Sequence, residues 1–290
     1  MHKTNGLVVV LNKMISAMGI KQMVVKIRNW YDIMTSDTFT CSIGDIMLLR
    51  EMPLNNQLLL TSRLLDVERY VNEQDDSFFY QNSISFKAYG EEHSEILGNQ
   101  LFEDLIKSYI KDGYRKGSLI TCDKDMCLID GNHRMGLQAY LKIETIDVRR
   151  IKREIPFSYS SYWYYSAGLS TSFMESIFKR YEELQDWLVE SGNTFCVYIS
   201  LYSSELELDI KRMSRVLRTY RVPNGGMLIQ ISFHKPNYDV IKGALVSKRA
   251  IELEDILTKR AGAGTIVKVS RNCMEGKRLF LDLNRKHERC

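Results

Sequence analysis

The sequence predicts an α+β protein built from two successive units, and three observations lead to this fold class. Residues 101–112 show the clearest helical periodicity, with apolar side chains on one face and charged side chains on the other. Residues 118–129 have the pattern of two short strands around the turn Asp123-Lys124-Asp125. From residue 155 to the C-terminus, helical and strand patterns alternate, which is typical of a second α/β unit.

The composition is that of a globular protein with a substantial core. The chain has 290 residues, of which 44% are hydrophobic and 26% charged. Its net charge of +4 argues neither for nor against a nucleic-acid partner. The six cysteines are too few for a disulfide framework, and no apolar run is long enough to span a membrane. We therefore expect a cytoplasmic protein with reduced thiols.

Three segments are expected along the chain. Residues 1–80 form an N-terminal helical extension, residues 81–154 a first domain, and residues 155–290 a C-terminal α/β domain. The boundary near residue 154 follows from a basic cluster and the proline after it. Strands are expected at residues 83–89, 118–121, 126–129, 146–148, 194–200, 227–233, 265–269 and 278–283, and helices at 57–72, 101–112, from the turn at 130 to 141, 171–190, 205–219 and 250–260.

The first 30 residues are basic and amphipathic. Five lysine and arginine residues precede the first acid, Asp32, and an apolar stripe of helical spacing runs from Leu7 to Met18. Two interpretations stay open. The segment is a helix that packs on the core and leads into a strand beginning at Met23, or it lies on an anionic membrane surface. We favour packing on the core, because such stripes usually face one.

The run Asp130-Gly131-Asn132-His133-Arg134 concentrates groups that bind phosphate between a strand and a helix. Gly131 lets the backbone approach a ligand closely, and the first N–H groups of the helix face that ligand. Arg134 offers a fork that matches phosphate oxygens, and His133 can donate a hydrogen bond or a proton. Asp130 can hold magnesium or fix a neighbouring side chain. The plainer alternative is a turn into an ordinary helix with surface side chains.

The surroundings of this turn resemble the ParB/sulfiredoxin superfamily over about residues 84–150. A helix ending at Gly113, a strand at 118–121, a hairpin, and a D-G-x-H-R turn that opens a helix follow the order of that family. The Asp-Gly-Asn-His-Arg string is closest to its free-serine-kinase-like branch. The glycine that the family usually has after the helix is Lys142 or Ile143 here.

The resemblance implies that residues 81–154 bind a nucleotide triphosphate, ATP or another, together with Mg²⁺. It places the phosphates at the turn and near the end of the preceding helix. From its carboxylate, Asp130 is the side chain that we expect to contact the metal. The nucleotide-binding residues carried over are Gly131, Asn132, His133, Arg134, Lys107 and Ser108.

Differences within the family narrow the expected activity. Sulfiredoxins have a cysteine where this chain has Asn132, which argues against their chemistry. ParB proteins continue with a helix-turn-helix, whereas residues 155–290 alternate helices and strands. The serine-kinase branch has a carboxylate in the loop before the first helix, and the matching residues here are Glu91 and Glu92, which the sequence does not separate. The plainer alternative for this loop is a solvated acidic stretch.

The expected function is that of an ATP-dependent phosphotransferase, a kinase that acts on a hydroxyl of a small molecule, a sugar or a glycan. Its catalytic residues would be Glu91, Glu92, Asp130 and His133, and the C-terminal domain would supply the acceptor pocket. The alternative is a nucleotide-gated, DNA-associated ParB-like protein that binds CTP or ATP. The DNA phosphates would then contact the cluster at Arg149, Arg150, Lys152 and Arg153. The missing helix-turn-helix argues against a nucleic-acid partner, and no dense carboxylate cluster supports a two-metal nuclease.

Overall fold

The computed structural model describes residues 20–48, 54–72, 95–113, 119–155, 170–222 and 225–285. Helices and strands are mixed along this part of the chain, which confirms the expected α+β class. No helix in these ranges is both long enough and apolar enough to cross a bilayer. In chain order the elements are α2 (Ile20–Thr35), β1 (Asp37–Ser42), α3 (Gly44–Met47), α4 (Leu54–Val71), α6 (Glu95–Asp112), β2 (Ile120–Cys122), β3 (Leu128–Asp130), α7 (Asn132–Tyr140), β4 (Thr145–Arg150), α9 (Thr171–Glu190), β5 (Phe195–Ile199), α10 (Ser204–Met213), β6 (Arg215–Arg221), β7 (Met227–Ser232), β8 (Tyr238–Ile241), β9 (Ala244–Ser247), α11 (Lys248–Arg260), β10 (Val267–Val269) and α12 (Cys273–Arg285).

The first sheet has the strand order β1-β4-β2-β3. The central strand β4 is antiparallel to β1 and parallel to β2, and β2 and β3 form the expected antiparallel hairpin. Alternate residues of β4 are buried, among them Ile146 and Val148, which is the pattern of a strand with one face on a core. Helices α4 and α7 cross closely over this sheet. A side chain at Gly136 of α7 would come within 2.9 Å of Arg63 Cβ in α4.

One prediction in this half of the chain is wrong, and one strand was not predicted. Residues 20–35 form the helix α2, so no strand begins at Met23. The strand β1 was not predicted, because only Phe39, Cys41 and Ser42 of its six residues are buried and the rest are polar. It lies in the expected N-terminal extension but pairs with β4, so the sheet extends across the expected boundary at residue 80. The strand expected at 83–89 and the apolar stripe from Leu7 to Met18 lie outside the described residues.

Long and periodic segments were predicted well. The helix at 101–112 belongs to α6 and ends at Gly113, whose φ of 72° and N–H bond to the Tyr109 carbonyl make the expected cap. The other expected helices at 57–72, 130–141, 171–190 and 250–260 are confirmed as α4, α7, α9 and α11.

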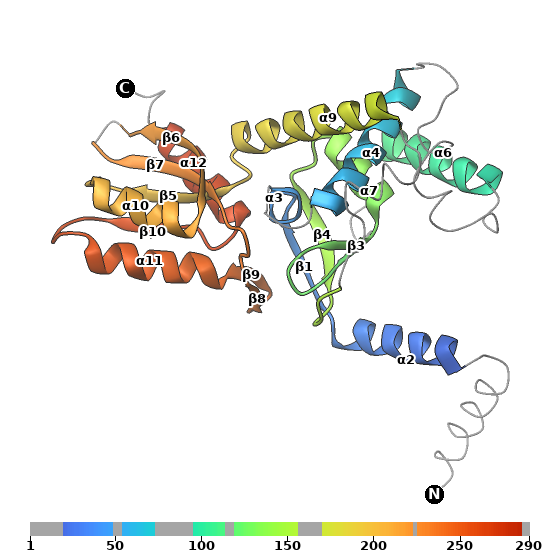
Figure 1. Ribbon diagram of the computed structural model, residues 1–290, viewed down its shortest axis with the longest axis horizontal. Coiled ribbons are helices and arrows are strands. Elements are labelled where there is room, and N and C mark those ends of the chain that lie inside the picture. The colour runs from blue at the N-terminus through green and yellow to red at the C-terminus, as the bar shows by residue number, and fades with distance from the viewer. Residues whose placement is uncertain are drawn as a thin grey trace, which may run out of the picture.

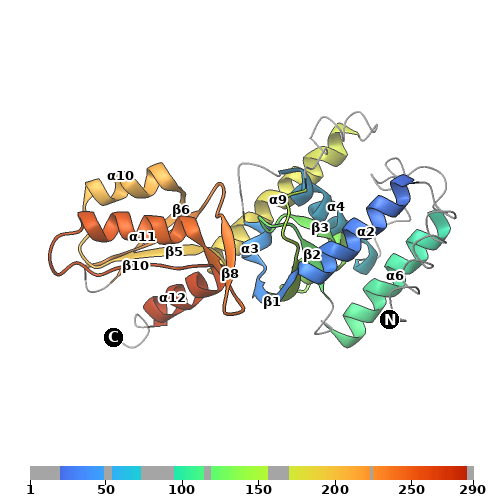
Figure 2. The same ribbon diagram turned by 90° about the horizontal axis from the view of Figure 1, so that it is seen from below.

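The second sheet is antiparallel, with the strand order β10-β5-β7-β6. Figure 2 shows α12 on one side of this sheet and α10 and α11 on the other. The helix expected at 205–219 ends at Met213, because Ser214 is extended and residues 215–221 pair with β7 as β6. The strand expected at 278–283 is part of helix α12, whose Gly276 lies so close to the Thr194 carbonyl that no side chain would fit. The hairpin of β8 and β9 was not predicted.

The two sheets contribute to one continuous hydrophobic core. Between them, the buried carboxylate of Asp45 accepts hydrogen bonds from the Tyr238 hydroxyl at 2.9 Å and from the Cys273 N–H at 3.0 Å. It thereby lies at the N-terminus of α12, where a negative charge is favourable. Ser42 donates a hydrogen bond to the Asn193 side chain at 2.9 Å. These polar contacts hold the first sheet against the second unit, which α9 also connects (Figure 1).

Candidate functional site

The turn at Asp130–Arg134 lies where β3 ends and α7 begins. Gly131 precedes the helix with a φ of 100°, a left-handed conformation that favours glycine. Its carbonyl accepts the first helical hydrogen bond, from the Met135 N–H at 2.8 Å. A side chain here would also place its Cβ 2.8 Å from Ile120 Cγ2. Both the backbone conformation and the lack of space therefore require glycine at this position.

The N-terminus of α7 differs from those of three other helices. Ser170, Ser203 and Ser247 precede α9, α10 and α11, and each serine hydroxyl accepts a hydrogen bond from the N–H three residues on. Gly131 has no side chain that could do the same for α7. The first N–H groups of α7 therefore point toward the turn without an N-cap side chain, as an anion-binding helix end requires.

Arg134 folds back beside this helix end. Its Nη1 donates a hydrogen bond to the Leu119 carbonyl, just before β2. Its Nη2 lies 3.6 Å from the carboxylate of Asp130, which is 75% exposed. The structure thus brings together an exposed carboxylate, a guanidinium and a helix N-terminus, as the sequence predicted.

His133 lies on the inner side of the turn. Its ring is 4.5 Å from the ring of Phe102 on α6, measured between centroids. Burial, together with the positive charges of Arg63 and Arg134, lowers the pKa of His133 to about 3. The imidazole is therefore neutral near pH 7. Of the two roles expected for it, hydrogen-bond donation suits this state, and proton donation does not.

A buried ion pair beneath the turn was not found from the sequence. Arg63 and Asp66 of α4 are 2% and 0% exposed, and their charged groups lie 3.1 Å apart. The sequence carried only a weak signal, because Arg63 and Asp66 are spaced by three around Leu64 and Leu65 in a helix that has other polar residues nearby. The Arg63 charge acts on His133, so this pair is part of the electrostatic environment of the turn.

Two amide side chains in α7, one half-buried and one buried, have buried polar atoms without a hydrogen-bond partner among the described residues. Asn132 Oδ1 has no hydrogen-bond partner among the described residues, and neither Oε1 nor Nε2 of Gln138 has one. Gln138 is fully buried. A buried acceptor at Asn132, directly after Gly131, is suited to a ligand group that donates a hydrogen bond.

The remaining predicted site residues are less closely tied to the turn. Lys107 is exposed on α6, pairs with Glu103 at 3.6 Å and lies over the ring of Tyr70 at the end of α4. Its pKa is raised, chiefly by the hydrogen bond with Tyr70. Ser108 is half-buried on the same helix. The predicted carboxylates Glu91 and Glu92 lie outside the described residues.

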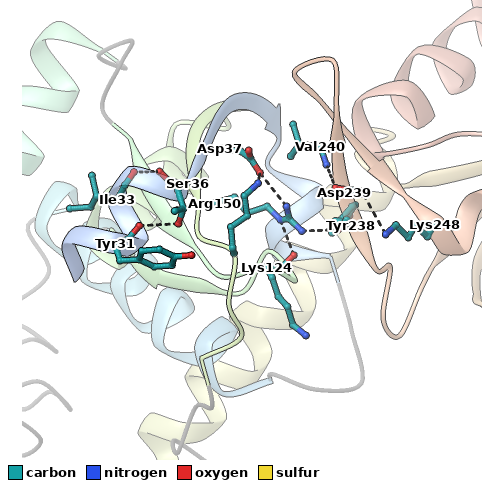
Figure 3. A network of polar contacts seen from close by, with 12 residues as sticks. Tyr31, Ile33, Ser36, Asp37, Lys124, Arg150, Tyr238, Asp239, Val240 and Lys248 are labelled. Carbon is teal, nitrogen blue, oxygen red and sulfur yellow. Dashed lines mark hydrogen bonds and ion pairs between the residues drawn. The ribbon is translucent and has the colours of Figure 1, made fainter. Parts of the chain in front are cut away.

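Most of the basic cluster at the end of β4 and just after it is used in internal contacts, and Figure 3 shows those of Arg150. Arg150 is buried, and its guanidinium donates to the carbonyls of Lys124 and Tyr238 and pairs with Asp37. Lys152 also pairs with Asp37, and Arg153 pairs with Asp32. At these three positions the charge is balanced within the protein, which removes support for the cluster as a DNA-contacting surface.

The described residues contain no group of three or more histidine, cysteine, aspartate or glutamate side chains that could hold a metal ion. A magnesium ion bound to a nucleotide takes one or two carboxylates together with phosphate oxygens, so the single exposed carboxylate of Asp130 is sufficient for this requirement. Comparisons with protein-family models, with curated proteins and with solved structures gave no match.

Proposed function

We propose that this protein is an ATP-dependent phosphotransferase that phosphorylates a hydroxyl group, with the nucleotide phosphates bound at the N-terminus of α7. The observation that supports this proposal best is the position of Gly131. Its backbone conformation and the lack of space require glycine there, and glycine leaves the end of α7 without an N-cap side chain. Arg134 beside it and the exposed Asp130 supply the two other groups that a polyphosphate needs. The resemblance to the free-serine-kinase-like branch supports the same activity.

In the proposed reaction, an acceptor hydroxyl oxygen forms a bond to the γ-phosphorus while the bond to the β-phosphate oxygen breaks and ADP leaves. The hydroxyl proton passes to a carboxylate, for which we propose Glu91 or Glu92. The first N–H groups of α7 and the Arg134 guanidinium stabilise charge on the phosphate oxygens. Magnesium, when bound, would neutralise further charge there, and Asp130 is the side chain that would hold it.

His133 has a positioning role in this proposal. A neutral imidazole packed on Phe102 can donate a hydrogen bond but carries no charge toward the phosphates. The acceptor is proposed to be a small molecule, a sugar or a glycan. No observation favours the alternative of a nucleotide-gated DNA-associated protein, since three of the four residues of its basic cluster, Arg150, Lys152 and Arg153, are engaged in internal ion pairs.

Nucleotide binding is tested first, with two variants that lose the same charge. Arg134→Gln should weaken ATP binding, measured by titration calorimetry with magnesium, by about tenfold or more, because a charge-assisted contact contributes about 1.5–3 kcal/mol. Arg149→Gln, on strand β4, which β2 separates from β3, is the control and should bind as the wild type does. Equal affinities in both variants and the wild type would remove Arg134 from the site.

Phosphoryl transfer is tested with labelled ATP and a panel of hydroxyl acceptors. Glu91→Gln or Glu92→Gln should lower turnover by about 10²–10⁴-fold and leave ATP affinity nearly unchanged, because a base acts mainly in the transition state. Asp130→Asn should raise the magnesium concentration needed for half-maximal activity. Full transfer in excess chelator, or ATP binding without transfer to any acceptor, would count against the proposal.

A further inference from the structure

Helix α2 carries an apolar stripe that faces solvent. The members of this stripe recur at helical spacing along one side of the helix and are each between 47% and 66% exposed. They are Val24, Ile27, Trp30, Tyr31 and Met34. Figure 1 shows that α2 stands apart from the first sheet and that the C-terminal end of α2 leads directly into β1. An exposed apolar stripe of this length is typical of an interaction surface.

The side of α2 away from the stripe carries the residue that is held to the protein, and it also carries two exposed apolar residues, Val25 and Ile33, at 53% and 52%. Asp32 is buried, and its carboxylate accepts hydrogen bonds from Nε and Nη2 of Arg153 at 2.6–3.0 Å. At 100° per residue, Asp32 lies roughly 140° around the helix from Ile27, the middle of the stripe. The ion pair therefore fixes α2 with its apolar stripe turned away from the first sheet. This is the reverse of a helix that packs on a core.

Positive charge borders the stripe on both sides. Lys26 precedes Ile27 and Arg28 follows it, so the two side chains lie about 100° to either side of that residue, and both are exposed. The sequence of α2 contains one further cation, Lys21, and a single acid, Asp32, whose charge is balanced by Arg153. The surface around the stripe thus has a net positive charge.

We propose that α2 docks on the surface of an anionic phospholipid bilayer. The apolar stripe would enter the headgroup boundary, and Lys26 and Arg28 would contact lipid phosphates. Trp30 and Tyr31 suit this position, because their rings combine an apolar body with a polar group. A second copy of the chain fits less well, since pairing two such stripes would bring Lys26 and Arg28 close to the same cations. This inference does not depend on the proposed phosphotransferase activity.

Vesicle co-sedimentation of the full chain tests the proposal, with phosphatidylcholine vesicles and with equimolar phosphatidylcholine and phosphatidylglycerol vesicles. We expect binding to the anionic vesicles and little to the neutral ones. The double variant Ile27→Glu/Trp30→Glu should lose this binding. The double variant Lys26→Gln/Arg28→Gln should reduce partitioning by roughly 25-fold, at about fivefold for each lost charge. Tryptophan fluorescence should shift to shorter wavelength on binding, because Trp30 is one of the three tryptophans of the chain.

Two matched controls separate a surface role from a general effect of substitution. Leu208→Glu places a charge on another exposed apolar residue, and Lys259→Gln/Lys268→Gln removes two exposed cations from the second unit. Both should bind anionic vesicles as the wild type does, and all variants should keep the wild-type thermal melt. Equal binding to neutral and anionic vesicles, or wild-type binding by Ile27→Glu/Trp30→Glu, would overturn the proposal. A different result would also overturn it. This is a wild-type chain that does not bind vesicles but forms a dimer in analytical ultracentrifugation, together with loss of that dimer in Ile27→Glu/Trp30→Glu.

Discussion

Replacing Gly131 by alanine tests the geometry on which the proposed site depends. Two separate penalties are expected from the structure. The backbone at this position has a φ of 100°, where a residue with a Cβ costs about 1–2 kcal/mol. The new Cβ would also lie 2.8 Å from Cγ2 and 3.2 Å from Cβ of Ile120, a buried core residue. Forcing an extra carbon into such a packed site typically costs about 1–3 kcal/mol.

The expected loss in the free energy of unfolding is therefore about 2–5 kcal/mol for Gly131→Ala. Gly113→Ala is the matched control, because Gly113 also has a positive φ, of 72°, but a Cβ there would meet nothing within 4 Å. It should lose only the conformational part, about 1–2 kcal/mol. The difference between the two variants isolates the steric contact with Ile120.

Urea denaturation followed by circular dichroism gives the two free energies, and thermal melts give a second measure, at about 2 °C of Tm for each kcal/mol in a chain of this size. If Gly131→Ala costs no more than Gly113→Ala, the close approach of Gly131 to Ile120 is refuted. ATP titration of Gly131→Ala, at a temperature where the variant is folded, then shows whether its ATP affinity differs from that of the wild type and so whether the turn has changed.

Three further predictions concern buried polar groups. His133 should make the protein acid-sensitive. Its pKa is about 3 in the folded protein and about 6.5 in the unfolded chain, so the unfolded chain takes up the proton first and stability is lost as pH falls from about 6.5 toward 3. The loss is at most about 1.4 kcal/mol per pH unit, and His133→Gln should give a flatter profile in denaturation across this range. Asp45→Ala removes the acceptor of hydrogen bonds from a tyrosine hydroxyl and two backbone N–H groups, so it should lower the free energy of unfolding by about 3 kcal/mol or more. Asp186→Ala on the surface is the control and should lower it by under about 0.5 kcal/mol. Similar losses in the two variants would contradict the role of Asp45. Gln138→Met should leave stability unchanged or raise it by about 1–2 kcal/mol, because it removes an unsatisfied buried amide, and a large loss in the same assay would show that the amide has partners.

The local sequence pattern was sufficient to predict secondary structure where a segment is long or where the residues of its turn are distinctive. The apolar periodicity of α6 and α9 and the glycine after α6 predicted these helices without knowledge of their neighbours. The glycine in the turn before α7 likewise predicted a helix start with a left-handed residue, and the structure has one.

Short segments depended on their partners. Residues 215–221 continue the helical pattern of α10 but form β6, because they pair along β7. Residues 278–283 alternate like a strand, yet they belong to α12, where Gly276 allows the helix to lie against the Thr194 carbonyl. In each case the contact that decides the structure comes from residues distant in the sequence, which local propensity does not report.

The sequence by itself determined the mixed α and β class, the longer helices, and the group of Asp130, Gly131 and Arg134 at a helix start. Only the tertiary structure decided the neutral state of His133, which follows from burial beside Phe102 and from the charge of Arg63. It also decided that Arg150 and Arg153 serve internal ion pairs and that the apolar side of α2 faces outward. The physical reason is the same in each case, because pKa, charge pairing and exposure depend on what lies against a side chain in space, and periodicity records only which side of an element is apolar.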